Sequence, residues 1–341
     1  MSAQFKNIIK YTIALAAAAL LFWLAVRKMD FAQMVNDVRQ ADFNWIAITV
    51  IISLFSHLAR AARWNLLLKP LGFAPKLMNT FLAVMIGYFA NIFVPRMGEV
   101  SRCAVLNKTE NVHFNSAFGT VVAERVFDLI CLMLLIGLSF VLEYQRFSDF
   151  FFNYLLKSDE AKAGSLLNNP IIYLGLGFIL IVLIIAFLYR RQLLASSLYA
   201  KVKTFILGLI EGALSIRKLD HKDKALFLLH TFLIWFGYYL MTYLMFFSLP
   251  YTSGLDPIAG LVILIAGSLG MSAPVQGGIG AFELAVSKAL NIFYSLTEDQ
   301  GTIYAIVVHA SQVLAVFVLG GICIIIFFLI KRKESPAPQN T

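Results

Sequence analysis

Long apolar runs alternate with short polar stretches along this chain. Six runs are apolar enough to be predicted as membrane-spanning helices, which need about 20 residues to cross the hydrocarbon core. They cover residues 11–26, 45–66, 117–142, 171–189, 225–249 and 303–330. The first run follows two lysines, as in a signal peptide, but Arg27 and Lys28 come after it where a cleavage site would need small residues. We therefore expect an uncleaved first span.

Two further apolar regions are broken by Pro and Gly. The first, 77–94, ends before Pro95, and a polar arm follows it up to residue 110. If that second arm crossed the membrane, it would bury Glu99, Arg102 and other charges, each at a cost of roughly 2.5–3.5 kcal/mol. A re-entrant hairpin over 77–110 is therefore predicted.

The second broken region covers residues 258–294 and is interrupted at Pro274. Its arms are more apolar, because only Glu283 and Lys288 are charged. A re-entrant hairpin and two full spans both remain possible here. In either case the Pro and Gly residues break the helix near the middle of the region.

The basic residues predict the orientation. Of 28 Lys and Arg, 20 fall in alternate polar stretches that include both termini, and 7 fall in the others. The positive-inside rule places the richer set, and so both termini, in the cytoplasm. Residues 1–170 and 171–333 are then predicted to contain the same series of elements, which is two spans, a hairpin and a span, in opposite orientations across the membrane. Such an inverted repeat with broken helices is typical of transporters that bind substrate at the membrane midplane.

Composition excludes several classes of protein. With 60% hydrophobic and 14% charged residues, the chain is no soluble domain, which carries about 25% charge. The net charge of +9 lies in the connections and so predicts no nucleic-acid partner. The three cysteines have no spacing typical of a disulfide framework or a metal site, and no cofactor is expected. An amphipathic stretch, 193–216, is predicted to lie on the inner leaflet, and the tail 334–341 to be disordered.

The span 117–142 contains Glu124, Arg125 and Asp128. Arg125 and Asp128 are three residues apart and are predicted to pair along the helix. Glu124 is then left over, and ionisable groups at this depth need a partner or an aqueous cavity. Its candidate partners are Arg60, Arg96 and Arg102.

The segment from residue 91 to residue 102 is the richest in candidate site residues. Pro95 is expected to end the incoming arm, and Gly98 to permit a tight turn. The next helix would then present free amide groups beside two arginines, which suits a phosphate. Glu99 is also explained by helix capping alone. The candidate residues here are Asn91, Pro95, Arg96, Glu99 and Arg102.

The break of the second region is rich in glycine. Its candidate residues are Pro274, Gly277, Gly278, Gly280 and Glu283. No strand precedes them and no Walker lysine follows, so nucleotide binding is not expected. The glycines are explained by a turn or close packing, whereas Glu283 needs a functional or structural partner.

Other polar residues in the spans have simpler interpretations. Arg60, Arg63 and Trp64 end the second span and are predicted to anchor it at the interface. His57 and His309 are predicted to form interhelical hydrogen bonds.

The motif from Asn91 to Arg102, then Glu124 and Arg125, then Pro274 to Glu283, resembles the membrane region of lysylphosphatidylglycerol synthases. This region also occurs in stand-alone, flippase-like proteins, and the resemblance covers about residues 5–330. It implies an inner-membrane protein that moves a lipid with its head group. Full-length synthases carry a soluble catalytic domain after the spans, and none follows here, so no aminoacyl transfer or other enzyme activity is expected.

The leading hypothesis is a flippase or scramblase for a phospholipid or polyprenyl-phosphate-type lipid. The arginines would hold an anionic head group, and the acids would balance charge or bind a proton or cation. The alternatives are a solute or proton-coupled transporter of inverted-repeat design, and a non-transporting membrane partner of a lipid-modifying enzyme. The expected partners are therefore membrane lipids and, in the last case, that enzyme.

Overall fold

The computed structural model describes residues 16, 19–25, 31–150 and 219–334. The described residues form helices and connecting loops, with no strand among them. Most of the predicted first span, the span 171–189, the amphipathic stretch 193–216 and the tail beyond 334 lie outside these ranges. Residues 19–25 of the first span are helical.

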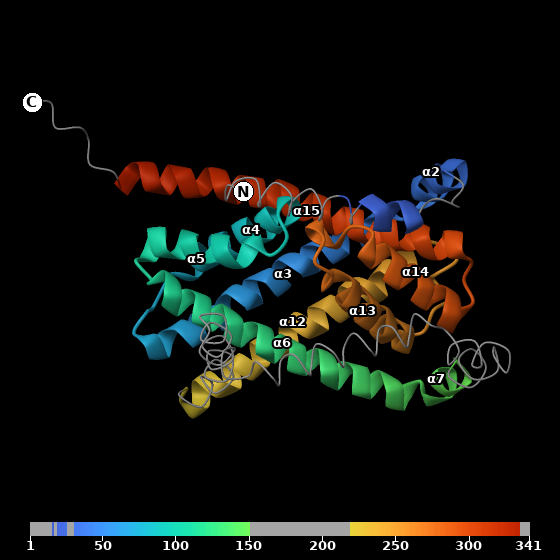
Figure 1. Ribbon diagram of the computed structural model, residues 1–341, viewed down its shortest axis with the longest axis horizontal. Coiled ribbons are helices and arrows are strands. Elements are labelled where there is room, and N and C mark those ends of the chain that lie inside the picture. Colours follow the sequence, from blue (N-terminus) through green and yellow to red (C-terminus); the bar gives the residue numbers. More distant parts are fainter. Residues whose placement is uncertain (1–15, 17–18, 26–30, 151–218, 335–341) are drawn as a thin grey trace, which may run out of the picture.

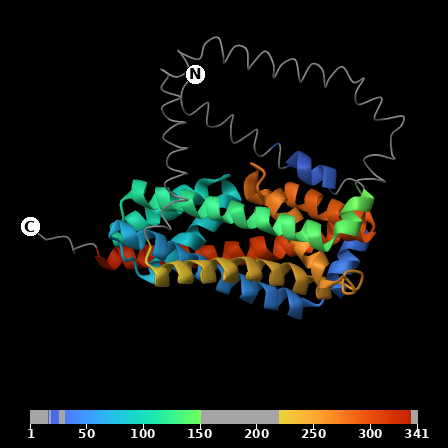
Figure 2. The ribbon, with the colours of Figure 1, turned by 90° about the horizontal axis from the view of Figure 1, so that it is seen from below.

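Four helices of the described chain are long and apolar enough to cross a membrane. They are α3 (Phe43–Leu68), α6 (Phe114–Leu142), α12 (His221–Met245) and α15 (Glu298–Glu334). All four run along the long axis of the molecule (Figures 1 and 2). They confirm four of the predicted spans, and the chain is an all-α polytopic membrane protein.

Side chains of aspartate define where several helices begin. Asp42 accepts a hydrogen bond from the backbone N–H of Asn44 at the start of α3 (2.9 Å), and Asp220 accepts one from Asp223 at the start of α12 (2.7 Å). These caps satisfy amide groups that have no partner within the first helical turn.

The first broken region folds as α4 (Leu77–Phe93) and α5 (Met97–Glu110). Val94 is extended, as expected for a residue before proline. The open ends of the hairpin lie together, because Glu110 of α5 accepts hydrogen bonds from two groups at the start of α4, the Lys76 N–H (3.1 Å) and the Asn79 side-chain amide (2.6 Å). With 17 and 14 residues, the arms are about 26 and 21 Å long, shorter than the hydrocarbon core of about 30 Å.

The second broken region folds as α13 (Pro257–Met271), η6 (Gln276–Gly278) and α14 (Ala281–Tyr294). Three glycines between the two helices have positive φ, at 57° for Gly277, 79° for Gly278 and 82° for Gly280. Glycine adopts this conformation without strain from a side chain, which confirms the interpretation of these residues as a turn.

The tips of the two hairpins meet. η6 contacts α4, and a Cβ added to Gly277 would lie 3.9 Å from the Cα of Ile92. In Figure 1, α4 and α5 occupy one half of the long axis and α13 and α14 the other half. The arrangement agrees with hairpins that enter from opposite ends. The six-span count and the inverted repeat remain predictions, because part of the second half lies outside the described residues.

Glycine has a different role at the first tip from the one expected. The left-handed residue of this turn is Arg96 (φ 61°), so the prediction that Gly98 supplies the turn was wrong. Gly98 is required instead for close packing of α5 on α4. A Cβ added there would lie 2.4 Å from the carbonyl oxygen of Gly87, a contact that no side chain permits.

Two short helices were not predicted. α2 (Phe31–Gln40) and α7 (Tyr144–Phe150) lie in stretches that were expected to be connections between spans. α2 packs Met34 and Val38 against the core beside α15.

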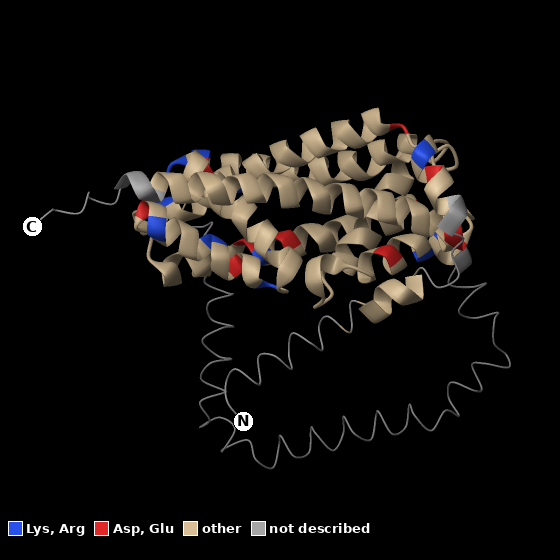
Figure 3. Cartoon of the chain, turned by 90° about the horizontal axis from the view of Figure 1, so that it is seen from above, with Lys and Arg blue, Asp and Glu red and all other residues tan. Residues whose placement is uncertain are grey.

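The outer surface matches a lipid environment. α6 and α15 expose large apolar side chains, which include Leu134, Val141, Leu314 and Phe328. Figure 3 shows Lys, Arg, Asp and Glu gathered at the two ends of the long axis, with a few along its middle. Those few charged residues along the middle are unexpected in a lipid environment.

The hairpin geometry predicts which loops share a side of the membrane. Single cysteines at Leu71 and His113, placed in a background without the native cysteines, should react with an impermeant maleimide only from the cytoplasmic side. Cysteines at Ser253 and Thr297 should react only from the opposite side. Labelling of Leu71 and His113 from opposite sides would contradict a re-entrant α4–α5 pair.

The contact between α4 and α5 predicts a loss of stability for Gly98→Ala. The added Cβ meets backbone atoms that cannot rotate away, so we expect a destabilisation of about 1–3 kcal/mol by denaturant titration in detergent. Gly119→Ala is the control, because nothing lies within 4 Å of its Cβ position in α6. That variant should be neutral or up to about 1 kcal/mol more stable. Equal effects of the two substitutions would contradict the close approach.

Candidate functional site

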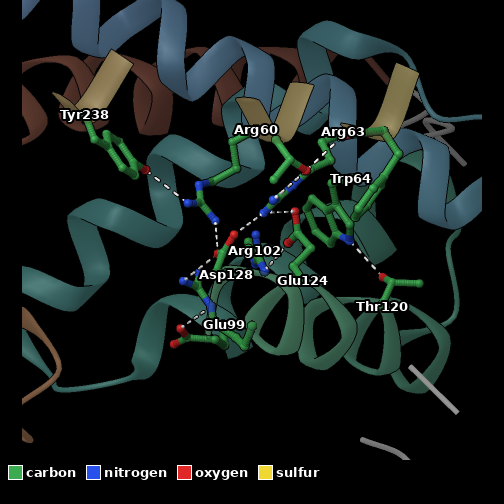
Figure 4. Close-up of polar contacts among 12 residues, drawn as sticks. Arg60, Arg63, Trp64, Glu99, Arg102, Thr120, Glu124, Asp128 and Tyr238 are labelled. Carbon is green, nitrogen blue, oxygen red and sulfur yellow. Dashed lines mark hydrogen bonds and ion pairs between the residues drawn. The ribbon is translucent and has the colours of Figure 1, made fainter. Parts of the chain in front are cut away.

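A group of charged side chains, most of them buried, lies among α3, α5 and α6, and Figure 4 shows contacts within it. We call it the arginine cluster. It consists of Arg60 and Arg63 on α3, Glu99 and Arg102 on α5, and Glu124, Arg125 and Asp128 on α6.

Glu124 is the most deeply buried acid of the cluster, with no exposed surface. Arg102 donates a hydrogen bond to its carboxylate at 2.6 Å, and Arg63 lies 3.7 Å from the other oxygen. The guanidinium of Arg102 also stacks over the ring of Trp64, with 4.6 Å between its Cζ atom and the ring centroid. The prediction that Glu124 needs a cationic partner is confirmed, and Arg102 is that partner.

Asp128 joins three arginines. It accepts hydrogen bonds from Arg60 at 3.0 Å and Arg63 at 2.7 Å, and Arg125 lies 3.6 Å away along the same helix. The predicted pairing of Arg125 with Asp128 is therefore confirmed. Because Arg60 also donates to the hydroxyl of Tyr238 at 3.0 Å, the cluster is tied to α12 as well.

Arg60, Arg63 and Trp64 are not interface anchors, and that prediction was wrong. All three are buried, with 3%, 0% and 0% of their surfaces exposed. The indole N–H of Trp64 donates to the hydroxyl of Thr120 on α6 at 2.8 Å. Arg and Trp near a helix end have the same local sequence pattern whether they anchor the helix at the membrane interface or pair with buried acids. Only the acids of α6 distinguish the two cases.

Arg125 is the least engaged cation of the cluster. Its side chain is 45% exposed, and its guanidinium approaches Glu99 and Asp128 only at 3.6 Å, with no hydrogen bond recorded to another described residue. It faces a small cavity between α4, α5 and α6. The cavity is lined by Val84, Gly87, Tyr88, Asn91, Gly98, Glu99, Arg102 and Arg125.

The start of α5 differs from the expected anion site. The N–H of Gly98 already donates to the side-chain oxygen of Asn91 at 2.6 Å, so this amide is not free. Arg96 is exposed and has no recorded ion pair with the described residues. Of the residues predicted in this segment, Asn91, Glu99 and Arg102 line the cavity, whereas Arg96 and Pro95 form the turn beside it.

The charges of the cluster do not cancel. Four arginines face three carboxylates, which leaves one positive charge in excess within the described chain. Several buried polar atoms also have no hydrogen-bond partner there, which include the Nε atoms of Arg60, Arg63 and Arg102 and one oxygen of Glu99. Buried charge in a low dielectric favours the uptake of a counter-ion. The arrangement can therefore bind a small anion.

The predicted residues of the second hairpin lie in a separate site. Glu283 is buried and accepts a hydrogen bond from the Gly280 N–H at 2.7 Å, and this bond caps the start of α14. Its other oxygen contacts Nδ1 of His309 on α15 at 2.7 Å. The predicted interhelical hydrogen bond of His309 is therefore confirmed. For His57, the structure shows a ring contact with Tyr88 of α4 in place of the predicted hydrogen bond, and its Nδ1 has no partner among the described residues.

The buried ion pairs predict a large loss of stability for Glu124→Gln. The substitution leaves the buried guanidinium group of Arg102 without its carboxylate and removes the 3.7 Å ion pair of Arg63, which still holds Asp128, at a cost of about 3–5 kcal/mol. Denaturant titration in detergent measures it, and Arg146→Ala, which breaks a half-exposed pair with Glu143, should cost less than about 1 kcal/mol. A loss for Glu124→Gln no greater than the control would contradict the burial of this pair.

Comparison with known proteins gives matches along most of the chain. The family model of the lysylphosphatidylglycerol synthase TM region matches residues 8–320. A UPF0104 membrane protein of Methanocaldococcus jannaschii is 28% identical over 258 residues, which are 74% of this chain and 98% of that protein. A UPF0104 membrane protein of Pyrococcus horikoshii is 24% identical over 280 residues, 79% of this chain and 81% of that protein.

A further UPF0104 membrane protein of Methanocaldococcus jannaschii is 30% identical over 125 residues, but the match spans only 37% of its length. No solved structure matches the chain significantly. The family model covers both hairpins, the arginine cluster and the Glu283–His309 contact. The chain therefore belongs to the lysylphosphatidylglycerol synthase TM region family of integral membrane proteins.

Proposed function

We propose that this protein moves an anionic lipid across the membrane and that the arginine cluster holds the lipid head group. The family supports a lipid-related role in the membrane. The excess positive charge of the cluster supports a substrate with one negative charge on its phosphate, as a phosphodiester head group has.

The observation that carries this proposal is the state of Arg125. Its guanidinium lies at the edge of the cavity, is half-exposed and holds its two carboxylates only loosely. A phosphate oxygen placed between Arg125 and Arg102 would accept two charge-assisted hydrogen bonds. Arg60 and Arg63 are held firmly by Asp128 and would keep the binding arginines in position.

Glu99 would compete with the head group. Its carboxylate lies 3.6 Å from Arg125, and its second oxygen has no partner among the described residues. When a phosphate leaves, Glu99 can take its place beside Arg125, so the arginine is never left as an uncompensated charge. This exchange would lower the cost of release, and the acyl chains would stay in lipid beside the apolar surfaces of α6.

The proposal predicts that Arg125→Ala loses lipid translocation. Proteoliposomes would carry head-group-labelled lipids with anionic, zwitterionic and cationic heads, and translocation would be followed by quenching of the exposed label. Loss of one charge-assisted contact worth about 1.5–3 kcal/mol should slow the transport of the anionic lipid roughly 10- to 100-fold. Arg125→Lys, which keeps the charge but loses the bidentate geometry, should lie between Arg125→Ala and the wild type.

Arg146→Ala is the matched control, since this arginine is 42% exposed and also paired with two carboxylates, but it lies on α7, outside the cluster. It should transport like the wild type. If folded wild-type protein translocates no lipid, the proposal fails. Solute transport, or a role as a membrane partner of a lipid-modifying enzyme, would then be favoured.

A further inference from the structure

The contacts of His309 are unusual because both of its ring nitrogens face acceptors. Nδ1 lies 2.7 Å from a carboxylate oxygen of Glu283, and Nε2 lies 2.9 Å from the backbone carbonyl oxygen of Gly277. A carbonyl carries no proton, so Nε2 must be the donor to Gly277. A second proton must then lie between Nδ1 and Glu283 to complete the other hydrogen bond.

The surroundings favour an anionic Glu283. Its second oxygen accepts the Gly280 N–H, and the residue lies in the first turn of α14, where the helix dipole stabilises negative charge. With Glu283 ionised, His309 carries protons on both nitrogens and the pair is neutral. Both residues are buried, with 4% and 6% of their surfaces exposed. The ring of Phe282 packs against that of His309, and the two ring centroids lie 4.8 Å apart.

The other ionisable groups on the helices packed against α15 are engaged elsewhere or lie at the surface. Lys288 of α14 pairs with Glu298, Arg60 and Arg63 of α3 pair with Asp128, and His57 of α3 contacts Tyr88 of α4. On α2, Arg39 is exposed and Asp37 partly exposed. Within the described chain, no recorded ion pair joins a third charged group to Glu283 or His309.

We propose that Glu283 and His309 form a binding site for one transported or coupling proton, and that this proton controls the tip of the second hairpin. Release of the proton to water leaves a Glu283 carboxylate and a neutral His309 with one N–H. That single N–H cannot serve both acceptors, and the carboxylate is the stronger one. The hydrogen bond to Gly277 is then lost, and the tip is no longer tied to α15.

The position of Gly277 gives this release a consequence at the arginine cluster. η6 packs on α4 beside Ile92, and the adjacent Asn91 both lines the cavity and binds the first turn of α5. A change at the second tip therefore acts on a wall of the proposed head-group site through direct contact. This coupling rests on the proposed function, whereas the proton site itself does not.

The proton site is tested by solid-state ¹⁵N NMR of histidine in the full chain reconstituted in liposomes, with His309 assigned by its loss in His309→Gln. We expect a doubly protonated His309 at acid pH that loses the Nε2 proton as pH rises. In Glu283→Gln, the side-chain amide can donate to Nδ1 of a neutral His309. Both contacts are then made without the extra proton, and the titration of His309 should disappear.

Glu298→Gln is the control, because it removes a carboxylate paired with Lys288 and should leave the titration unchanged. A His309 that is neutral at acid pH, or that titrates in Glu283→Gln as in the wild type, overturns the proposal. Where Glu283→Gln does not fold, the wild-type spectrum alone decides. The measurement needs no transport, so failure of lipid translocation with a titrating His309 overturns only the proposed function.

Discussion

The cost of placing charge in hydrocarbon governs the arrangement of this protein. Each ionisable side chain of the arginine cluster would cost a few kcal/mol on an isolated helix in the membrane. Pairing removes most of that cost only if α3, α5 and α6 lie together, and Arg60 extends the requirement to α12 through Tyr238. The same cost would oppose a crossing of the membrane by α5 as a full span. The charges thus determine both which helices are neighbours and where the chain turns back.

Small residues let the helices approach closely enough for these pairs to form. Gly87 and Gly98 bring the backbones of α4 and α5 into contact, and Gly237 of α12 packs on Ser56 of α3. In lipid there is little hydrophobic gain from bringing helices together, so packing of small residues and polar pairing have to supply the association. The two features depend on each other, because a guanidinium reaches its carboxylate only across a short interhelical distance.

Much of the fold could be predicted from local pattern, and less of the site. Pro95 and the charges after it identified the α4–α5 hairpin, and spacing alone predicted the pair of Arg125 and Asp128. The burial of Arg63 could not be predicted, because Arg and Trp near a helix end are equally typical of an interface anchor. Arg96 was missed as the left-handed residue, since a glycine two positions later was the better local candidate. In each case the missing information concerned contacts between residues that are distant in sequence.

The molecule separates two kinds of buried charge. Arginine stays protonated at any physiological pH, so the arginines of the cluster would hold an anion in the proposed site but cannot themselves take up or release a proton. The pair of Glu283 and His309 differs, because histidine titrates in that range and its two acceptors need two protons on one ring. Any use of a proton gradient by this protein would have to pass through such a titratable group. The contact between the hairpin tips would then provide a direct physical route from that proton to the arginines.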